Sequence, residues 1–399
     1  IRTSHYPCNP YFYELCDKWG MYVLAEANVE CHGNTNLSSE EKFKAAMVER
    51  NERHVLTCRN HACICLWSYG NESGGGNNCQ AVENAIKALD KTRLTHYEGN
   101  STWADVTSTM YASVDNIAFI GSSRQNEAAQ GQKPRPHVQC ENSHSMGNSM
   151  GNQREYFDLY EKYPALTGEF IWDFKDQGIT VPVPNATGKT YFAYGGDFGD
   201  NPNSGNFCCN GVVMPDYTLT AKAFNVKKIY QPADFAAKNV SKGTFTIKNK
   251  LNFRNLSDYD FSYTVTEDGI EIAKGDLGSV DVAPGKSGEI TIADLLPANA
   301  RDDAEYFVRF SVRLRNATVW ADAGYEVANE QILLRAATTR QPYASTSTAA
   351  LTVTESGSSI IVEGADFKAT FSKTSGQLYN YSVGGTQVMS ATLNFNAFR

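Results

Sequence analysis

One stretch decides the fold: Cys63-Ile64-Cys65-Leu66-Trp67-Ser68-Tyr69-Gly70-Asn71-Glu72-Ser73. Its first seven residues are almost all apolar, which indicates a strand buried on both faces, as in a parallel sheet. An Asn-Glu pair and a glycine-rich loop follow this strand directly. In an α/β barrel the residues at the carboxyl ends of the strands form the site of chemistry. Glu72 is therefore predicted to lie in such a site.

A second strand-like stretch ends in the same way. His137-Val138-Gln139-Cys140 is followed directly by Glu141. Two carboxyl groups at strand ends favour glycoside hydrolysis, in which one carboxyl protonates the leaving oxygen and the other attacks the sugar or activates water. The alternative, that Glu72 and Glu141 are ordinary surface glutamates in loops, stays open on composition alone.

Residues 1 to about 226 alternate short apolar stretches with amphipathic ones, which is typical of βα units. Asn9-Pro10 predicts a helix start with an N-cap and a first-turn proline. Ser38-Ser39-Glu40-Glu41 predicts a second start as a capping box. The spacing of Val82, Ile86 and Leu89 predicts a helix with one apolar face. The predicted strands are residues 21–26, 63–69, 94–98, 138–141 and 167–173.

The character of the sequence changes near Gln231-Pro232. Alternating strands and turn pairs such as Asp268-Gly269 follow, and about a hundred residues of this kind favour an immunoglobulin-like β-sandwich. A Ser/Thr/Ala-rich linker at residues 338–350 precedes a third β stretch. We therefore expect an α/β plus β fold. Its expected parts are a partial (β/α)8 TIM barrel in residues 1–228, a sandwich in 229–336 and the start of a further β-sandwich in 337–399.

The composition excludes some classes of partner. The 399 residues, 41% hydrophobic and 20% charged, predict a soluble globular protein of several domains. A net charge of −8 and the lack of an apolar run of ~20 residues exclude nucleic acid and a membrane as expected partners. The ten cysteines lack the spacing of a disulfide framework, which favours a cytoplasmic location. A periplasmic or secreted location stays open, because a signal peptide would precede Ile1.

Three further groups of residues have binding chemistry. Glu30 and His32 are two apart in an extended segment, so they could share a hard cation such as Mg²⁺, with Glu72 as third ligand. A solvated loop is the alternative for that pair. Trp172 could give a sugar a flat apolar wall or fill the core. His5 and His144 are candidates for sugar-hydroxyl contacts, or structural histidines.

Several motifs together resemble one family. In chain order they are Ser4-His5-Tyr6-Pro7, Glu26-Ala27-Asn28-Val29-Glu30-Cys31-His32-Gly33, Trp67-Ser68-Tyr69-Gly70-Asn71-Glu72-Ser73-Gly74, Met110-Tyr111, Cys140-Glu141, His144-Ser145-Met146-Gly147-Asn148-Ser149 and Tyr194-Gly195-Gly196-Asp197-Phe198-Gly199-Asp200. Their order and spacing resemble the bacterial lactose-hydrolysing β-galactosidases of glycoside hydrolase family 2. The resemblance extends over essentially the whole chain.

The resemblance implies a retaining exo-β-galactosidase, a homotetramer, that acts on lactose-like galactosides by double displacement. Glu141 would be the nucleophile and Glu72 the general acid and base, with carboxyl groups about 5 to 5.5 Å apart. The implied ligands are Glu30, His32 and Glu72 for Mg²⁺, and the Phe207 carbonyl and Asn210 for Na⁺ (or K⁺). The implied galactose contacts are His5, Asn71, Met110, Tyr111, His144 and Trp172.

The sequence departs from the family pattern at three places. Asn142-Ser143 follow the predicted nucleophile where Tyr and Ala are usual, Gly75 stands where a His is frequent, and Cys31 replaces a Thr. The family also has domains that would precede Ile1 and follow Arg399. We therefore expect the 399 residues alone to have unpaired strand edges and no activity.

Two other functions compete with this prediction. A β-glucuronidase or β-mannosidase of the same family would keep Glu72 and Glu141. The metal pair Glu30 and His32, and the Na⁺-like segment at residues 207–210, favour the galactosidase. A non-catalytic carbohydrate-binding or assembly fragment is the alternative from a different class. Such a fragment would need neither Glu72 nor Glu141.

Overall fold

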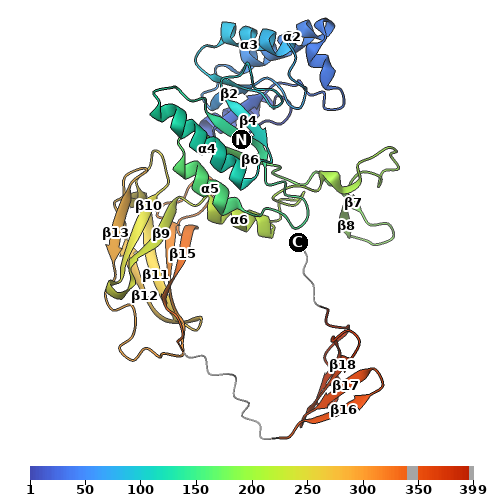
Figure 1. Ribbon diagram of the computed structural model, residues 1–399, viewed down its shortest axis with the longest axis vertical. Helices are drawn as coiled ribbons and strands as arrows, with labels where there is room; N and C mark the ends of the chain where they lie inside the picture. Colours follow the sequence, from blue (N-terminus) through green and yellow to red (C-terminus); the bar gives the residue numbers. More distant parts are fainter. Residues whose placement is uncertain (339–348, 395–399) are drawn as a thin grey trace. The chain divides into compact units, whose positions relative to one another are not determined.

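The computed structural model describes residues 1–338 and 349–394. The chain forms two compact units, Ile1–Ile229 and Tyr230–Arg399. Figure 1 shows helices mixed with strands in the first unit and a fold built mainly of strands in the second. Residues 339–348, most of the predicted linker, and residues 395–399, the end of the third predicted β stretch, lie outside the described residues.

The first unit alternates strands with helices, as predicted. Its strands are β1 (Val23–Glu26), β2 (Ile64–Ser68), β3 (Leu94–His96), β4 (Thr107–Met110), β5 (His137–Asn142), β6 (Leu166–Ile171), β7 (Ile179–Pro182) and β8 (Thr190–Ala193). Its α-helices are α1 (Pro10–Trp19), α2 (Glu41–Cys58), α3 (Asn78–Leu89), α4 (Val114–Ala129), α5 (Gln153–Lys162) and α6 (Ala221–Ile229). Two short 3-10 helices are η1 (Thr35–Ser39) and η2 (Gly205–Cys208).

Two three-stranded parallel sheets, β1-β2-β3 and β4-β5-β6, form the centre of this unit. Their neighbouring edges touch where the Val106 N–H donates to the Thr95 carbonyl at 3.0 Å, but no ladder continues from this contact. β7 and β8 form a separate antiparallel hairpin. The α/β class is confirmed, whereas the described residues contain no closed barrel and the two sheets are not continuous.

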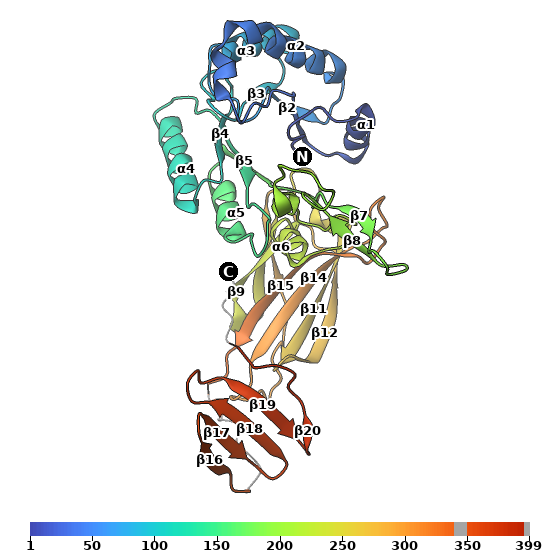
Figure 2. The same cartoon turned by 90° about the vertical axis from the view of Figure 1, so that its right-hand side faces the viewer.

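A core around Trp67 fixes the strand that leads to Glu72. Trp67 is 1% exposed, and its Nε1 donates to Asp90 at 3.0 Å. Beyond the strand, the rings of Tyr69 and Tyr97 stack with centroids 4.6 Å apart. Figure 2 shows α2 and α3 over β2 and β3, where they cover this core. The apolar residues among residues 63–69 thus fix the position at which the loop that carries Glu72 begins.

Both predicted helices form, but only the first of the two predicted caps is confirmed. The Asn9 side chain accepts a hydrogen bond from the Tyr11 N–H, and Pro10 opens α1. No capping box forms before α2, because residues 35–39 fold into η1 and the Ser38 hydroxyl donates to the Thr35 carbonyl instead. Helix α3 forms as predicted, with Val82 and Ile86 buried.

The second unit begins with two antiparallel sheets, β13-β10-β9 and β12-β11-β14-β15. Their strands are β9 (Ala233–Asn239), β10 (Thr244–Asn249), β11 (Tyr259–Glu267), β12 (Ile270–Gly278), β13 (Ser287–Thr291), β14 (Tyr306–Leu314) and β15 (Glu326–Arg335), with 3-10 helices η3 (Val240–Lys242) and η4 (Leu256–Asp258). Both sheets contribute to one apolar core. Phe235 of one sheet stacks on Phe310 of the other, with centroids 4.8 Å apart.

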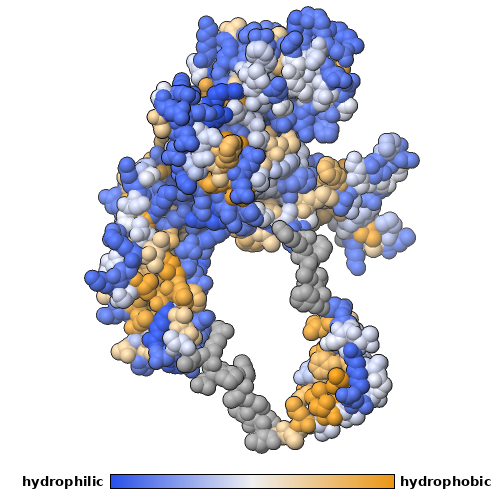
Figure 3. Space-filling model, in the orientation of Figure 1, coloured by the Kyte–Doolittle hydropathy of each residue, from blue (hydrophilic) through white to orange (hydrophobic). Residues whose placement is uncertain are grey.

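A last antiparallel sheet follows in the order β16 (Thr352–Ser356), β17 (Ser359–Glu363), β18 (Phe367–Ser372), β19 (Leu378–Val383) and β20 (Thr386–Gln387). Within these strands, as far as the structure describes them, only Ala369 and Thr370 are buried. Val353 and Tyr379 are among its exposed apolar side chains, and Figure 3 shows hydrophobic surface over this sheet. The sheet therefore has little core of its own.

All ten cysteines are free thiols. Burial raises the pKa of both Cys63 and Cys140 to about 12, so these two act as packing groups rather than reactive thiols.

In residues 1–338 and 349–394, no helix has both the length and the apolar character needed to cross a bilayer.

Candidate active site

Most of the predicted site residues lie at or just after the carboxyl ends of the parallel strands. Glu30 and His32 come after β1, Asn71 and Glu72 after β2, Met110 and Tyr111 at the end of β4, Glu141 within β5, and Trp172 directly after β6. His5 precedes β1, and His144 follows β5. Parallel strands bring such positions to one edge.

Glu141 is the most firmly held of these groups. Its side chain is 7% exposed. Arg2 Nη1 donates to Oε1 at 3.0 Å, and the Tyr111 hydroxyl donates to Oε2 at 2.9 Å. His5 Nε2 lies 3.6 Å from Oε1. Both carboxylate oxygens therefore have a donor from a different part of the chain, which fixes the plane of the carboxylate.

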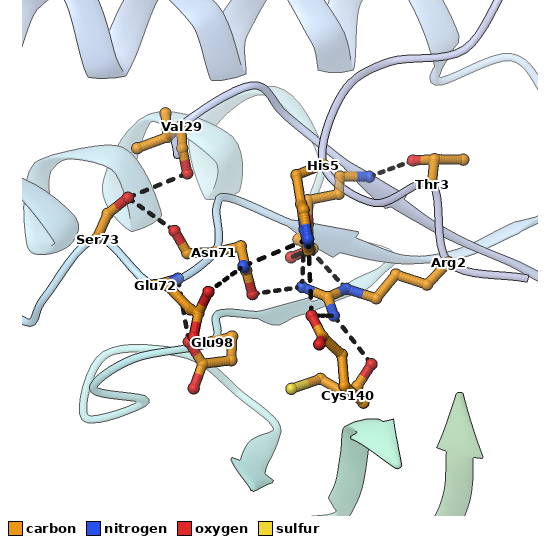
Figure 4. Close-up of polar contacts among 12 residues, drawn as sticks. Arg2, Thr3, His5, Val29, Asn71, Glu72, Ser73, Glu98 and Cys140 are labelled. Atoms are coloured by element: carbon orange, nitrogen blue, oxygen red, sulfur yellow. Dashed lines mark hydrogen bonds and ion pairs between the residues drawn. The ribbon is translucent and has the colours of Figure 1, made fainter. Parts of the chain in front are cut away.

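Arg2 was not predicted as a site residue, yet it contacts β1, β5 and the loop after β2. Besides Glu141, its guanidinium donates to Glu26 at 2.8 Å, to the Asn71 side-chain oxygen at 2.8 Å and to the Cys140 carbonyl at 2.9 Å. Figure 4 shows this group between Asn71, His5 and Cys140. Since Asn71 immediately precedes Glu72, Arg2 links the loop of one predicted catalytic glutamate to the side chain of the other.

Glu26 is the buried anion that compensates Arg2. Its side chain is 0% exposed. The Ser68 hydroxyl donates to it at 2.7 Å, and His5 Nδ1 lies 2.7 Å from its other oxygen. Burial acts to raise the pKa of Glu26, but Arg2 and His5 outweigh it and lower the pKa to about 2. The carboxylate is therefore ionised at any physiological pH.

The ionisation of Glu26 predicts how stability depends on pH. The folded-state pKa of about 2 lies below the ordinary 4.5, so ionised Glu26 stabilises the folded state above about pH 4.5. This contribution, about 3 kcal/mol from the size of the shift, is lost as pH falls from 4.5 toward 2. Urea unfolding measured across this window should show the loss. A Glu26→Gln variant should lose less over the same window, and an equal loss would contradict the prediction.

Glu72 has a different environment. Its side chain is 33% exposed, and its backbone φ of 40° lies in the left-handed region that non-glycine residues rarely adopt. The Glu72 N–H donates to Glu98 Oε2 at 3.0 Å. The Asn71 side-chain amide donates to the Glu72 carboxyl at 3.5 Å. Tyr111 also has a positive φ, 52°, so backbone strain is concentrated at this site.

Several residues that were predicted to contact the sugar lie near Glu141, and most of them are aromatic or imidazole rings. His5 stacks on Trp172 with centroids 5.1 Å apart and an interplanar angle of 15°. His144 lies between Tyr111 and Phe207, 5.8 Å from each ring centroid. Burial lowers the pKa of His144, although Glu141 acts in the opposite direction. Met110 is half-buried in β4, paired with Glu141 in register. These residues thus lie close together around Glu141.

Of the three predicted Mg²⁺ ligands, His32 and Glu72 form a close pair, and the Glu30 carboxyl is separate from it. His32 Nε2 lies 3.3 Å from Glu72 Oε2. Glu30 Oε2 is buried without a hydrogen-bond partner, and burial raises the pKa of Glu30, with Glu72 adding to the rise. Within the described part of the chain, no three His, Cys, Asp or Glu side chains converge closely enough to hold a metal. The donor types fit a hard cation, but the side chains as they stand are not preorganised for one.

The predicted Na⁺ ligands contact each other. The Asn210 side-chain nitrogen donates to the Phe207 carbonyl at 3.0 Å. Asn210 is 3% exposed, and its side-chain oxygen is buried without a partner. A hollow beside them is lined by Trp172, Asp200, Asn203 and other residues of the same loops. The unpartnered oxygen and the carbonyl are donor types that suit an alkali cation.

Comparison with known proteins decides the family. Residues 1–235 match the family described as "Glycosyl hydrolases family 2, TIM barrel domain", and residues 245–335 match "Beta-galactosidase, domain 4". The chain belongs to glycosyl hydrolase family 2. The family 2 resemblance seen in the motifs is confirmed, and the two parallel sheets lie within the region that matches the barrel domain.

Among curated family 2 relatives, the β-galactosidase of Priestia megaterium is 39% identical over 417 residues and that of Vibrio cholerae is 35% identical over 409. Each match covers 100% of this chain and 39% of the relative, so the chain spans about two fifths of their length. A solved structure of a β-glucuronidase from Bacteroides uniformis aligns with a TM-score of 0.41 and 16% identity, covering 94% of this chain and 48% of that one.

The residues that depart from the family 2 pattern have local contacts of their own. A Cβ at Gly75 would lie 2.2 Å from the Asn100 side chain, so a histidine there requires Asn100 to move. The Cys31 N–H donates to the Ser73 hydroxyl at 2.8 Å, and its thiol points at the Ser73 carbonyl. Asn142 donates to Glu169, away from Glu141. None of these three residues contacts the Glu141 carboxylate.

Proposed function

We propose that this family 2 chain carries the active site of a retaining exo-β-galactosidase, with Glu141 as nucleophile and Glu72 as general acid and base. The observation that supports it most is the contrast between the two glutamates. Glu141 is 7% exposed and held by two donors, whereas the Glu72 side chain is 33% exposed. A fixed carboxylate suits attack on a sugar, and an accessible one suits proton exchange with leaving groups and water.

The reaction would take two displacements. In the first, a Glu141 oxygen attacks the anomeric carbon while the bond to the leaving oxygen breaks and Glu72 gives that oxygen its proton. In the second, the Glu72 carboxylate takes a proton from water, whose oxygen displaces Glu141 and restores the original anomeric configuration. Arg2 and Tyr111 would hold Glu141 in the attacking orientation, through the hydrogen bonds of 3.0 and 2.9 Å.

A neutral sugar fits the surroundings of Glu141 better than an acidic one. The guanidinium of Arg2, the cation that contacts Glu141, is already directed at protein oxygens and at His5. It is therefore not available to pair with a substrate carboxylate. The stacked His5 and Trp172 rings offer flat surface to a sugar face. The β-galactosidase names of the curated relatives support the same substrate.

The test is hydrolysis of 4-nitrophenyl β-D-galactoside, β-D-glucuronide and β-D-mannoside by the full-length protein, with NMR of the first sugar released. We expect the galactoside to be preferred by at least about 10²-fold in kcat/KM, because hydroxyl contacts discriminate strongly. We also expect the β-anomer to appear first. Preference for another glycoside would overturn the substrate, and the α-anomer first would overturn the double displacement.

We further propose that Glu30, His32 and Glu72 bind Mg²⁺. The unpartnered buried oxygen of Glu30 and the 3.3 Å approach of His32 to Glu72 support it. A bound divalent cation would supply positive charge beside Glu72. Phe207 and Asn210 are likewise proposed to hold Na⁺ or K⁺, on the unpartnered Asn210 oxygen. A homotetramer and a cytoplasmic location remain predictions from the resemblance and the cysteine pattern.

Removing a carboxylate from the proposed Mg²⁺ site should weaken binding of the ion. We expect Glu30→Gln to raise the Mg²⁺ dissociation constant at least about tenfold, since a charged ligand is replaced by a neutral one. Titration calorimetry with Mg²⁺ on the EDTA-treated protein measures this directly. Glu49→Gln, on the exposed face of α2, is the matched control. Equal affinity in both variants would contradict the site.

A further inference from the structure

Glu98 is a further carboxyl at this site, and neither the sequence motifs nor the proposed mechanism uses it. It follows β3 and is half-buried. Its Oε2 accepts the Glu72 N–H at 3.0 Å, and its own N–H donates to the Gly70 carbonyl at 3.3 Å. Figure 4 shows Glu98 directly beside Glu72. Glu98 therefore contacts the loop of Glu72 through both its side chain and its backbone.

The backbone of Glu72 needs such a partner. Its φ of 40° is disfavoured for a residue with a side chain, so the surroundings must hold it. On the N-terminal side of Glu72, the Asn71 N–H donates to the Val29 carbonyl at 2.9 Å, which fixes the backbone there. The Ser73 hydroxyl donates to the Asn71 carbonyl at 2.7 Å. The Glu72 N–H lies between these contacts and is fixed by Glu98.

We propose that Glu98 is a positioning residue for proton transfer by Glu72, an inference that rests on the proposed function. Its carboxylate holds the Glu72 N–H, and through it the left-handed turn that aims the Glu72 carboxyl toward the leaving-group oxygen. The role requires an acceptor oxygen at this point and not a negative charge. Glutamine offers such an oxygen at the same distance along the side chain, whereas leucine has a similar size and offers none.

The experiment compares Glu98→Gln and Glu98→Leu in the full-length protein on two aryl β-galactosides. Phenyl β-D-galactoside has a poor leaving group that needs protonation, and 2,4-dinitrophenyl β-D-galactoside has one that leaves without it. The measured quantity is kcat/KM, which reports the first displacement. We expect Glu98→Leu to lose about 30- to 100-fold on the phenyl substrate and less than about 3-fold on the dinitrophenyl one, as for a misplaced general acid. Glu98→Gln should stay within about 3-fold on both.

Other patterns would overturn the proposal. An equal loss on both substrates means a structural role, no loss in Glu98→Leu means no role, and equal losses in the two variants mean that charge matters instead of the hydrogen bond. If Glu98→Leu does not fold by circular dichroism, Glu98→Asp, whose oxygen is withdrawn by one methylene, must show the same leaving-group dependence. Glu155→Leu, exposed on α5, is the control. An unsubstituted protein that hydrolyses no glycoside would instead defeat the proposed function, and the role of Glu98 with it.

Discussion

Replacing Glu141 with glutamine is expected to lower kcat on 4-nitrophenyl β-D-galactoside by at least about 10⁴-fold, because an amide cannot form the glycosyl ester through which double displacement proceeds. The substitution keeps the size of the side chain. It also keeps an oxygen for Arg2, whose Nη1 donates to Glu141 at 3.0 Å. The fold should therefore survive, and steady-state kinetics with the full-length protein measures the loss.

The matched control for this prediction is Glu155→Gln. Glu155 lies exposed on α5 and makes no contact with the Glu141 carboxylate. The control variant should retain full activity, and circular dichroism should show the same fold for both. A Glu141→Gln variant with more than about a tenth of the parent activity would remove Glu141 as the nucleophile, since a few-fold loss is too small for a missing covalent step.

The second large effect is on stability. Glu26→Leu is expected to lower the free energy of unfolding by about 3 to 5 kcal/mol, because it removes the more deeply buried of the two carboxylates that pair with the buried Arg2 charge. The Arg2 and Glu26 side chains are 2% and 0% exposed, so water cannot replace the lost carboxylate. Urea unfolding followed by tryptophan fluorescence measures the change. Trp67 lies in the core beside β1 and reports on this sheet.

A double variant separates the charge effect from packing. Arg2→Met together with Glu26→Leu removes both charges, so part of the stability should return, while activity stays low because Glu141 has lost a donor. Glu49→Leu, on the exposed face of α2, should change stability by less than about 1 kcal/mol. A loss of less than about 1 kcal/mol in Glu26→Leu would mean that the buried Arg2–Glu26 pair contributes little to the stability of the fold.

The sequence was sufficient for the strongly apolar elements. Strands β1, β2, β3, β5 and β6 lie within one or a few residues of their predicted positions. Strand β4 was not predicted, because Thr107-Ser108-Thr109-Met110 is polar and half-buried and has no alternating pattern. The β7-β8 hairpin was missed as well, since its side chains are mostly exposed. Backbone pairing with a neighbouring strand, rather than composition, makes these segments strands.

For the site, the motifs brought together Glu72, Glu141 and the aromatic residues, but not the groups that hold them. Arg2, Glu26 and Glu98 act through contacts with residues 24 to 139 positions away. No local spacing encodes such contacts. Their positions at strand ends were the available signal, since Glu26 and Glu98 each closed a predicted strand. A survey of every charged residue at a predicted strand end would have included both.

The order in which the partners of Arg2 leave the ribosome follows from their places in the chain. Glu26 is 24 residues away, Asn71 is 69 and Glu141 is 139. At 5 to 20 residues per second, Glu26 follows Arg2 within roughly 1 to 5 seconds, whereas Glu141 follows only after roughly 7 to 28 seconds. The nascent chain can therefore neutralise the arginine early. Glu141, the proposed nucleophile, then meets an arginine whose first carboxylate partner is already present, so no isolated cation has to be enclosed during synthesis.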